Sequence, residues 1–356
     1  MNTPEARDTQ PRTEQAESAQ PSGKQSPQSA LRLDFHSDPV ALTAALVDIA
    51  SPSHHEDTIA DAIEMALIDV QKQAAVDIEV QRYNNTVCAK TNAGFDTRVV
   101  LAGHVDTVPI ADNVPHSIAH DAAGQLVMHG CGTTDMKSGL AVYLHVFAQL
   151  VHHGNLSCDL TMIAYEGEEV ATQYNGLYHL QRDHPEWLSG DFALLGEPSG
   201  GIIEAGCQGT LRLKIGARGH RAHSARSWLG SNAAHILAPV MVKVADYQAR
   251  EVVIDGCTYR EGLNIVHLEA GVATNTIPDD AWMFVNFRFA PDRSEDEALA
   301  HALEVLGLDD LADDSPLYVE VDDSAGAALP GLGAPVAQRL VEAVGGNFRA
   351  KLGWTD

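Results

Sequence analysis

Four short polar segments combine histidine and carboxylate residues at spacings that suit metal-ion chemistry. The segments are GHVDT with His104 and Asp106, GCGTTDMKSG with Asp135, YEGEEV with Glu166, Glu168 and Glu169, and LLGEPS with Glu197. Residues i and i+2 of an extended chain point the same way, so His104 and Asp106 can converge, one binding a metal ion while the other orients it. Each segment alone has an ordinary alternative: a loop histidine, a helix cap at Asp135, a solvated acidic loop or a turn glutamate.

The adjacent acids Glu168 and Glu169 are the most informative pair. Adjacent carboxylates repel each other, so their clustering at the end of a buried strand needs a compensating cation. In an extended run the two side chains point to different sides, so one can bind a metal ion while the other acts as a base. Taken together, oxygen and nitrogen ligands of these types suit zinc, or manganese and cobalt in its place. Cys131 is a further candidate ligand, although a small buried thiol is the simpler interpretation.

The elements that must position these residues alternate between strands and helices. Apolar strands are predicted in TRVVLAGH, CDLTMIAY and DFALL, and each runs into one of the polar segments. Helices are predicted after Asp38 and Pro39, over IADAIEMALIDV, and over KSGLAVYLHVFAQLVHHG, which ends at Gly154. This alternation indicates an α/β domain, in which ligands bind beyond the carboxyl ends of the strands. The four polar segments should therefore meet at one edge of a sheet.

The pattern changes after about residue 209. A strand, a helix, two strands around a Pro-Asp-Asp turn and another helix follow, and they predict a small α+β insert over one sheet at 209–322. The insert would divide a catalytic domain into parts at 36–208 and 323–356, the second part with a helix at PVAQRLVEAVGG. Residues 1–35 are rich in Gln, Ser and Pro and are predicted to form a disordered tail.

Composition narrows the classes of partner. The chain of 356 residues has 23 Lys and Arg against 49 Asp and Glu, a formal net charge of −26. This charge argues against nucleic-acid binding, which needs a basic surface, and against docking on an anionic membrane. No apolar run is long enough to span a bilayer, and the N-terminus lacks the apolar core of a secretory signal. The five scattered cysteines indicate reduced thiols, so we expect a cytoplasmic protein.

The motifs LAGHVDTVP, GCGTTDMKSG, YEGEEV and LLGEPS resemble, in order and spacing, the metal motifs of the di-zinc aminoacylase and carboxypeptidase family. The resemblance covers the chain from about Asp38 to Asp356. It implies a zinc-peptidase-like α/β catalytic domain, with a mixed central sheet flanked by helices. It also implies that the α+β insert at 209–322 is a dimerisation or lid domain, and hence that the protein is a homodimer.

The resemblance further implies a set of metal ligands. His104, Asp135 and Glu197 would hold one zinc ion, and Asp135 would bridge to a second zinc ion that Glu169 also holds. Asp106 would orient His104. Each subunit would therefore bind two Zn²⁺ ions, with Co²⁺ as a substitute.

Catalytic and substrate-binding roles are implied in the same way. Glu168 matches the family's general base, and His220 matches a histidine that reaches the partner subunit's site and helps to bind the oxyanion. Asn275 and Arg288 match positions that contact substrate carboxylates. Two simpler interpretations remain open: His220 as a turn histidine within its own subunit, and Arg288 as the partner of a nearby acid. The acids in question are Asp292 and Glu295.

The substrate is suggested by the sequences around two of the motifs. GHVDTVPIADNVP and LLGEPSGGIIEAGCQGTLR look most like members that convert N-succinyl-LL-2,6-diaminopimelate and water into succinate and LL-2,6-diaminopimelate, a step of lysine biosynthesis. The implied partner is thus a small N-succinylated diamino acid. One alternative is the same machinery with another acyl group, as in an acetylornithine deacetylase or an aminoacylase. Another is a non-catalytic homologue that kept the fold.

One departure from the family pattern concerns the second zinc ion. In the family this ion takes a histidine from a segment that follows the position of Asp356, where this sequence stops. We therefore expect a fragment that lacks this ligand and the last strand and helix of the catalytic domain; the alternative is a chain that ends here and leaves the second ion one ligand short. Such a fragment should be weakly active or inactive, and a restored C-terminal extension should recover hydrolysis.

Overall fold

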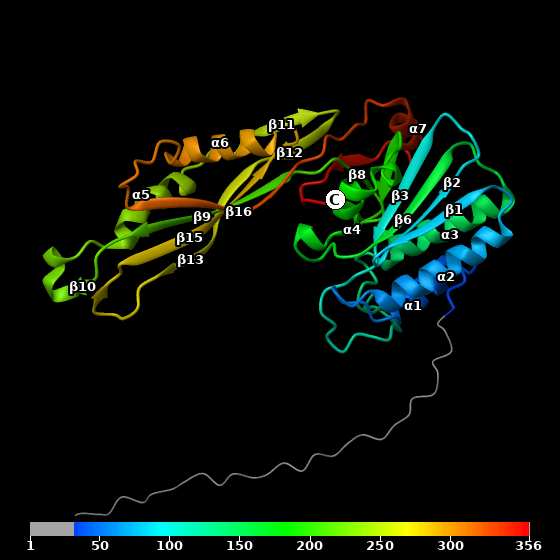
Figure 1. The fold of residues 1–356 in the computed structure, drawn as a ribbon, viewed down its shortest axis with the longest axis horizontal. Coiled ribbons are helices and arrows are strands. Elements are labelled where there is room, and N and C mark those ends of the chain that lie inside the picture. The colour runs from blue at the N-terminus through cyan, green and yellow to red at the C-terminus, as the bar shows by residue number, and fades with distance from the viewer. Residues whose placement is uncertain (1–31, 356) are drawn as a thin grey trace, which may run out of the picture.

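The first of two main sheets carries the segments of interest (Figure 1). The structure, a computed structural model, describes residues 32–355. The five strands of this sheet, in their spatial order, are β1 (Ile78–Tyr83), β2 (Thr86–Thr91), β6 (Asp159–Tyr165), β3 (Arg98–His104) and β7 (Phe192–Leu195). β3 is parallel to β6 and β7, whereas β2 is antiparallel to β1 and β6. The mixed central sheet is as the resemblance implies.

Helices cover both faces of the first sheet. They are α1 (Pro39–Val47), α2 (Asp57–Gln73), α3 (Lys137–His153) and α4 (Gly176–Asp183), with short 3₁₀ turns η1 (Thr172–Tyr174) and η2 (Pro185–Trp187). The larger apolar core lies between the sheet and α1, α2 and α3, and a smaller core under α4 contains the buried Trp187. The predicted helix ends are confirmed: the Asp38 carboxylate accepts the Val40 amide at the start of α1, and Gly154 ends α3 in the left-handed conformation.

The folded part of the chain begins before the predicted end of the tail at residue 35. Phe35 is only 1% exposed and packs into the core beneath α1, α2 and α3, so residues 32–35 belong to the folded part. Its carbonyl oxygen also lies 3.0 Å from Nδ1 of His145 on α3. A single large apolar side chain in a polar stretch was the available signal. Residues 1–31 of the predicted tail lie outside the described residues.

The second main sheet has four antiparallel strands, with helices on one face only. In spatial order the strands are β13 (Gly262–Ala270), β15 (Asp280–Phe289), β9 (Gly209–Arg218) and β16 (Leu317–Ala325). Helices α5 (Ala233–Ala245) and α6 (Glu295–Leu306) cover the apolar face. The sequence did not predict β16, which continues past the expected boundary at residue 322. A small sheet of β10 (Ala222–His223) and β14 (Thr276–Ile277), with the turn η3 (Ser224–Leu229), lies at the far end (Figure 1).

A fourth apolar cluster joins the two sheets. Its elements are the hairpin β11 (Glu251–Ile254) and β12 (Cys257–Arg260), the parallel pair β8 (Ile203–Ala205) and β17 (Phe348–Ala350), and α7 (Pro335–Ala343). Tyr259 of β12 is buried here, and its hydroxyl donates to the Ala205 carbonyl oxygen at 2.6 Å. A hairpin of the predicted insert therefore packs on residues outside that insert, because the apolar sides of both must be covered.

Two features lie apart from these cores. An exposed hairpin of β4 (Ser117–His120) and β5 (Leu126–His129) separates the segments that carry Asp106 and Asp135. Among residues 32–355, no helix combines the length and the apolar character that crossing a membrane requires.

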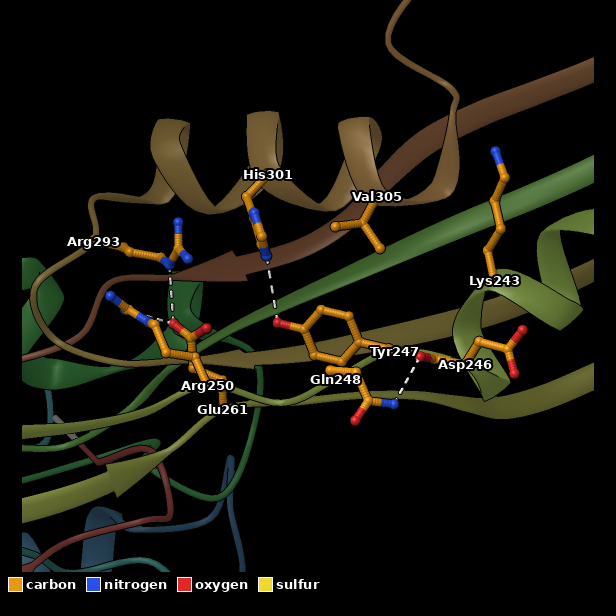
Figure 2. A pocket seen from close by; sticks show the side chains of 9 residues that line it. All are labelled: Lys243, Asp246, Tyr247, Gln248, Arg250, Glu261, Arg293, His301 and Val305. Carbon is orange, nitrogen blue, oxygen red and sulfur yellow. Dashed lines mark hydrogen bonds and ion pairs between the residues drawn. The ribbon is translucent and has the colours of Figure 1, made fainter.

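Glu261 is a buried carboxylate at one end of the second sheet, where it contacts several polar residues (Figure 2). Its side chain is fully buried, and Oε1 accepts hydrogen bonds from Arg250 (2.8 Å), Arg293 (2.9 Å) and the Ala290 amide (3.2 Å). Burial by itself would raise the pKa of Glu261, but these three donors outweigh it and hold the pKa below its usual value. The network borders an open pocket of about 500 Å³ beside α6.

We predict that Glu261→Gln destabilises the protein by about 2 kcal/mol at neutral pH, because two partly exposed arginines lose their buried counter-charge. Since the folded pKa is lowered, this stabilisation is present above about pH 4.3, the usual pKa of Glu in an unfolded chain, and is lost as the pH falls through the folded pKa. Urea unfolding at several pH values measures it. Asp246→Asn, at an exposed site on the same pocket, is the control; equal stability of the two variants would contradict the prediction.

Candidate metal centre

The four polar segments meet at one edge of the first sheet. His104 is the last residue of β3, the YEGEEV acids follow β6, and Glu197 follows β7. Because these three strands are parallel, their carboxyl ends lie side by side. Asp135 reaches the same edge from the residues that precede α3.

His104 lies at the centre of this group and is fully buried. Nδ1 donates to the main-chain carbonyl oxygen of Asp106 at 3.0 Å, and one carboxylate oxygen of Asp106 lies 3.5 Å away. Nε2 lies 3.1 Å from Oδ1 of Asp135 and 4.0 Å from Oε1 of Glu197. Asp106 thus fixes one ring nitrogen, while the other ring nitrogen faces the carboxylates of Asp135 and Glu197. This is the arrangement of a metal-binding imidazole.

Two groups of donor atoms are close enough to hold a cation. His104, Asp135 and Glu197 form the first group, and His104, Glu168 and Glu169 form the second, with all ligand atoms in a group within 4.8 Å of one another. The first group has the composition that the sequence predicts for one metal ion. In the second group His104 takes the place in which a bridging Asp135 was expected. One nitrogen and several carboxylate oxygens are a donor set that divalent cations such as Zn²⁺ accept.

Asp106 connects three segments of the site. Its carboxylate is completely buried, and Oδ1 accepts the Glu168 amide at 3.1 Å. Oδ2 accepts both the Glu169 amide at 3.1 Å and the Ser53 hydroxyl at 2.8 Å. The orienting partner of His104 therefore also fixes the main chain of the adjacent acids.

The pKa values reflect the crowding of negative charge. Burial disfavours the imidazolium of His104, but the Asp106 and Asp135 carboxylates outweigh burial and raise the pKa of His104 to about 11. The pKa of Asp135 is lowered, first by its hydrogen bond with His104 and also by the positive charge of Lys351. Burial, and then the charge of Asp135, raise the pKa of Glu169. Positive charge at this edge is therefore favourable, whether a proton or a metal ion supplies it.

Glycine allows the segments to approach this closely. A side chain at Gly139 of α3 would collide with the carbonyl oxygen of Gly196, the residue before Glu197. Gly139 is therefore required for α3 to reach the strand end. Gly167 has a φ of +72°, and a side chain there would collide with the carbonyl oxygen of Tyr174.

Two interpretations that the sequence left open do not describe the structure: Asp135 as a helix cap, and Cys131 as a metal ligand. The residue at the N-cap of α3 is Met136, without a side-chain capping hydrogen bond, so Asp135 is not a helix cap. Cys131 belongs to neither candidate group; it is buried, and its sulfur lies 3.6 Å from the Val108 carbonyl oxygen. The simpler interpretation of this thiol therefore holds.

The structure does not bring the other three predicted residues to His104 of the same chain. His220 and Asn275 lie near each other, since β10 pairs with β14 and the Ser224 amide donates to the Asn275 carbonyl oxygen at 2.9 Å. His220 precedes β10 and Asn275 precedes β14, and β10 lies at the end of the second sheet farthest from β3 (Figure 1). Arg288 lies near the opposite end of β15, where it pairs with Gly262 and Thr210.

Arg288 makes neither of the ion pairs that the sequence left open. Asp292 pairs with Arg250, and Glu295 accepts the hydroxyl of Ser324. Within residues 32–355, Nη1 of Arg288 is buried and has no hydrogen-bond partner.

Sequence reasoning missed two residues that act on the site. Ser53 donates to Asp106, and Lys351 lowers the pKa of Asp135 through its charge. Lys351 follows β17, whose partner β8 lies shortly after Glu197 in the sequence. Neither residue has a local signal, because both reach the site through pairings between segments far apart in the sequence.

Comparison with known proteins agrees with this geometry. Residues 100–345 match the family described as peptidase family M20/M25/M40. The chain is 58% identical over 325 residues to a succinyl-diaminopimelate desuccinylase of Corynebacterium glutamicum, covering 91% of this chain and 85% of that protein.

Solved structures share the fold. The aminopeptidase PepT of Bacillus cereus has a TM-score of 0.67 at 18% identity, with 89% of this chain and 85% of that chain covered. A dinuclear metal-binding peptidase of the M20 family from Bacillus subtilis has a TM-score of 0.56 at 13% identity, with 90% and 83% covered. The strand-end cluster of His104 and its carboxylates thus occurs in a chain that belongs to peptidase family M20/M25/M40.

Proposed function

We propose that this chain hydrolyses N-succinyl-LL-2,6-diaminopimelate to succinate and LL-2,6-diaminopimelate, a step of lysine and diaminopimelate biosynthesis. The main support for this proposal is the 58% identity to a succinyl-diaminopimelate desuccinylase over 91% of the chain. The matched span includes every residue of the metal-centre groups. The same machinery with an acetyl group, as in an acetylornithine deacetylase, is the main competing assignment.

We further propose that the centre binds two Zn²⁺ ions, which Co²⁺ can replace. His104, Asp135 and Glu197 would hold one ion, and Glu169, with Asp135 between the two, would hold the other. The close approach of these donors, and a relative described as a dinuclear metal-binding peptidase, support this proposal. Bound divalent cations would polarise the scissile amide carbonyl and lower the pKa of water.

Glu168 is proposed as the general base of the reaction. It is partly buried, and its amide donates to Asp106, so its main chain is held by the residue that also orients His104. In this role Glu168 takes a proton from the attacking water and delivers it to the leaving amine. His220 is proposed to donate a hydrogen bond to the oxyanion, a contribution of about 3 kcal/mol to transition-state stability.

The substrate carboxylates need cations or polar donors in a chain of net charge −26. Arg288 is proposed to bind one of them, since its buried Nη1 has no partner among the described residues and a guanidinium can hold a carboxylate with two hydrogen bonds. Asn275 is proposed as a second contact.

Distances along β15 support a proposal that these contacts come from two subunits. Asp280 and Arg288 are eight residues apart on one strand, which corresponds to about 26 Å. Asn275 lies beyond Asp280, so Asn275 and Arg288 of one chain cannot both contact a small substrate. We therefore propose a homodimer in which His220 and Asn275 complete the partner's site. The edge strand β13, with Val266 58% exposed and Leu268 50% exposed, is a candidate contact surface.

A cytoplasmic location is also proposed. All five cysteines are free, and no disulfide joins any two of them, which suits a reducing compartment.

Glu168→Gln should lower kcat by about 10³-fold while leaving the bound metal unchanged, because the amide cannot take the proton from water. Hydrolysis rates and metal content measured on the same samples test this. Glu166→Gln, in the same segment but hydrogen-bonded to the Asn85 amide, is the control and should have a small effect. Retained hydrolysis in Glu168→Gln would remove Glu168 from the role of base.

Mixing two inactive variants should restore activity if His220 acts on the partner's site. In a dimer of one Glu168→Gln subunit and one His220→Ala subunit, one site keeps both groups and the other loses both. Random pairing of equal amounts should therefore give about a quarter of the unsubstituted activity. Each variant alone is the control, and an inactive mixture would place His220 in its own subunit's site.

Arg288→Gln should raise KM for the succinyl substrate by about 10- to 100-fold, since a charge-assisted contact to its carboxylate is lost. Hydrolysis of the matching acetyl compound, which lacks that carboxylate, should change little. Arg212→Gln is the control, because Arg212 lies on the same face of the sheet but pairs with Asp322. A faster initial rate with the acetyl compound in the unsubstituted protein would reject the desuccinylase assignment.

A further inference from the structure

The loop after α1 runs beside the segment that carries Asp106. The Ser53 amide donates to the Thr107 carbonyl oxygen at 3.1 Å, and the Thr107 amide donates to that of Ser51 at 3.0 Å. The hydroxyl of Ser51, which is buried, donates to the Val105 carbonyl oxygen at 2.7 Å. These bonds hold the two segments in register on either side of Asp106.

Ser53 makes the one contact from this loop to the Asp106 carboxylate that the structure records. Its hydroxyl lies 2.8 Å from Oδ2 of Asp106, and the Thr107 carbonyl oxygen is a more distant acceptor at 3.4 Å. A hydroxyl has one proton to donate, and the shorter, charge-assisted bond to the carboxylate takes it. The other donors to the Asp106 carboxylate are the Glu168 and Glu169 amides, and Nδ1 of His104, which donates to the Asp106 main-chain carbonyl oxygen, lies 3.5 Å from Oδ1.

Removal of this hydroxyl would act on the carboxylate more than on the loop. The main-chain bonds of Ser53 and the side-chain bond of Ser51 do not involve the Ser53 hydroxyl, so they keep the loop in place. Oδ2 of Asp106, which is fully buried, would retain only the Glu169 amide. The two amides alone would then hold the carboxylate, and a rotation would change its distance from the imidazole and its bonds to the amides of the adjacent acids.

We propose that Ser53 is a positioning residue of the metal centre. It fixes the orientation of Asp106 and, through Asp106, the direction of the His104 ring and the main chain of Glu168 and Glu169. The inference rests on the proposed function in one respect, namely that the centre binds divalent cations. Loss of an outer partner of a metal ligand typically weakens metal affinity about 10- to 100-fold, and Ser53 fixes such a partner, Asp106.

The experiment measures Zn²⁺ affinity of the metal-free protein by competition with a chromophoric chelator. We expect Ser53→Ala and Ser53→Gly to bind Zn²⁺ about 10- to 100-fold more weakly than the unsubstituted protein. Ser53→Thr keeps the hydroxyl and should bind close to the unsubstituted value. The absorption spectrum of the Co²⁺-loaded protein should change in the two variants without the hydroxyl and not in Ser53→Thr.

Ser51→Ala is the matched control, because it removes a hydroxyl from the same loop that bonds to the main chain and not to Asp106. It should lower the melting temperature but leave Zn²⁺ affinity unchanged. Equal affinity of Ser53→Ala and the unsubstituted protein would overturn the inference, and so would equal weakening in Ser51→Ala. If the unsubstituted protein binds no divalent cation, the proposed metal centre fails first, and the variants do not differ from it.

Discussion

The repulsion among carboxylates at one sheet edge is the constraint on which the rest of the site depends. Asp106, Asp135, Glu168, Glu169 and Glu197 surround a single buried imidazole. Such a group of acids is unfavourable unless positive charge enters it. This excess of negative charge raises the pKa of His104 to about 11, and it adds to burial, which is the larger cause, in raising the pKa of Glu169. A divalent cation would compensate the same excess of negative charge with two positive charges, where a proton supplies one. The electrostatics therefore favour metal binding independently of any sequence comparison.

The fold limits the cost of this crowding by fixing the acids with main-chain donors. The carboxylate of Asp106 accepts two consecutive amides, those of Glu168 and Glu169, so one buried charge is satisfied by the chain that carries two others. Parallel strands deliver these segments to the same edge, and the close approach of α3 at Gly139 brings Asp135 within 3.1 Å of the imidazole. Rigid secondary structure, and not loop flexibility, therefore sets the spacing between the candidate ligands.

How much the sequence predicts depends on whether a feature has a local signal. The Asp38 cap, the Gly154 end and the strands that run into His104 and Glu197 follow from short-range patterns, and all are confirmed. The strand β16 and the hairpin β11–β12 were missed, because their exposed or mixed patterns gain order only from pairing with distant segments. Ser53 was missed for the same reason, since nothing in SPSHHED indicates that a hydroxyl will meet a carboxylate more than fifty residues away. The need for Gly139 is visible only when Gly196 is seen against it.

The two main sheets contribute differently to the proposed site, because their strands differ in direction and length. In the first sheet the candidate ligand atoms of each group lie within 4.8 Å of one another, because parallel strands end side by side. The second sheet is antiparallel, so its turns and strand ends alternate between two distant edges, and residues joined by a short stretch of sequence, such as Asn275 and Arg288, lie at opposite ends. Helices α5 and α6 cover one face of that sheet, and Arg288 and Arg212 lie on the opposite face. A site that needs both ends of such a sheet has to combine two copies of it, so the proposed dependence on a partner subunit follows from strand length and direction.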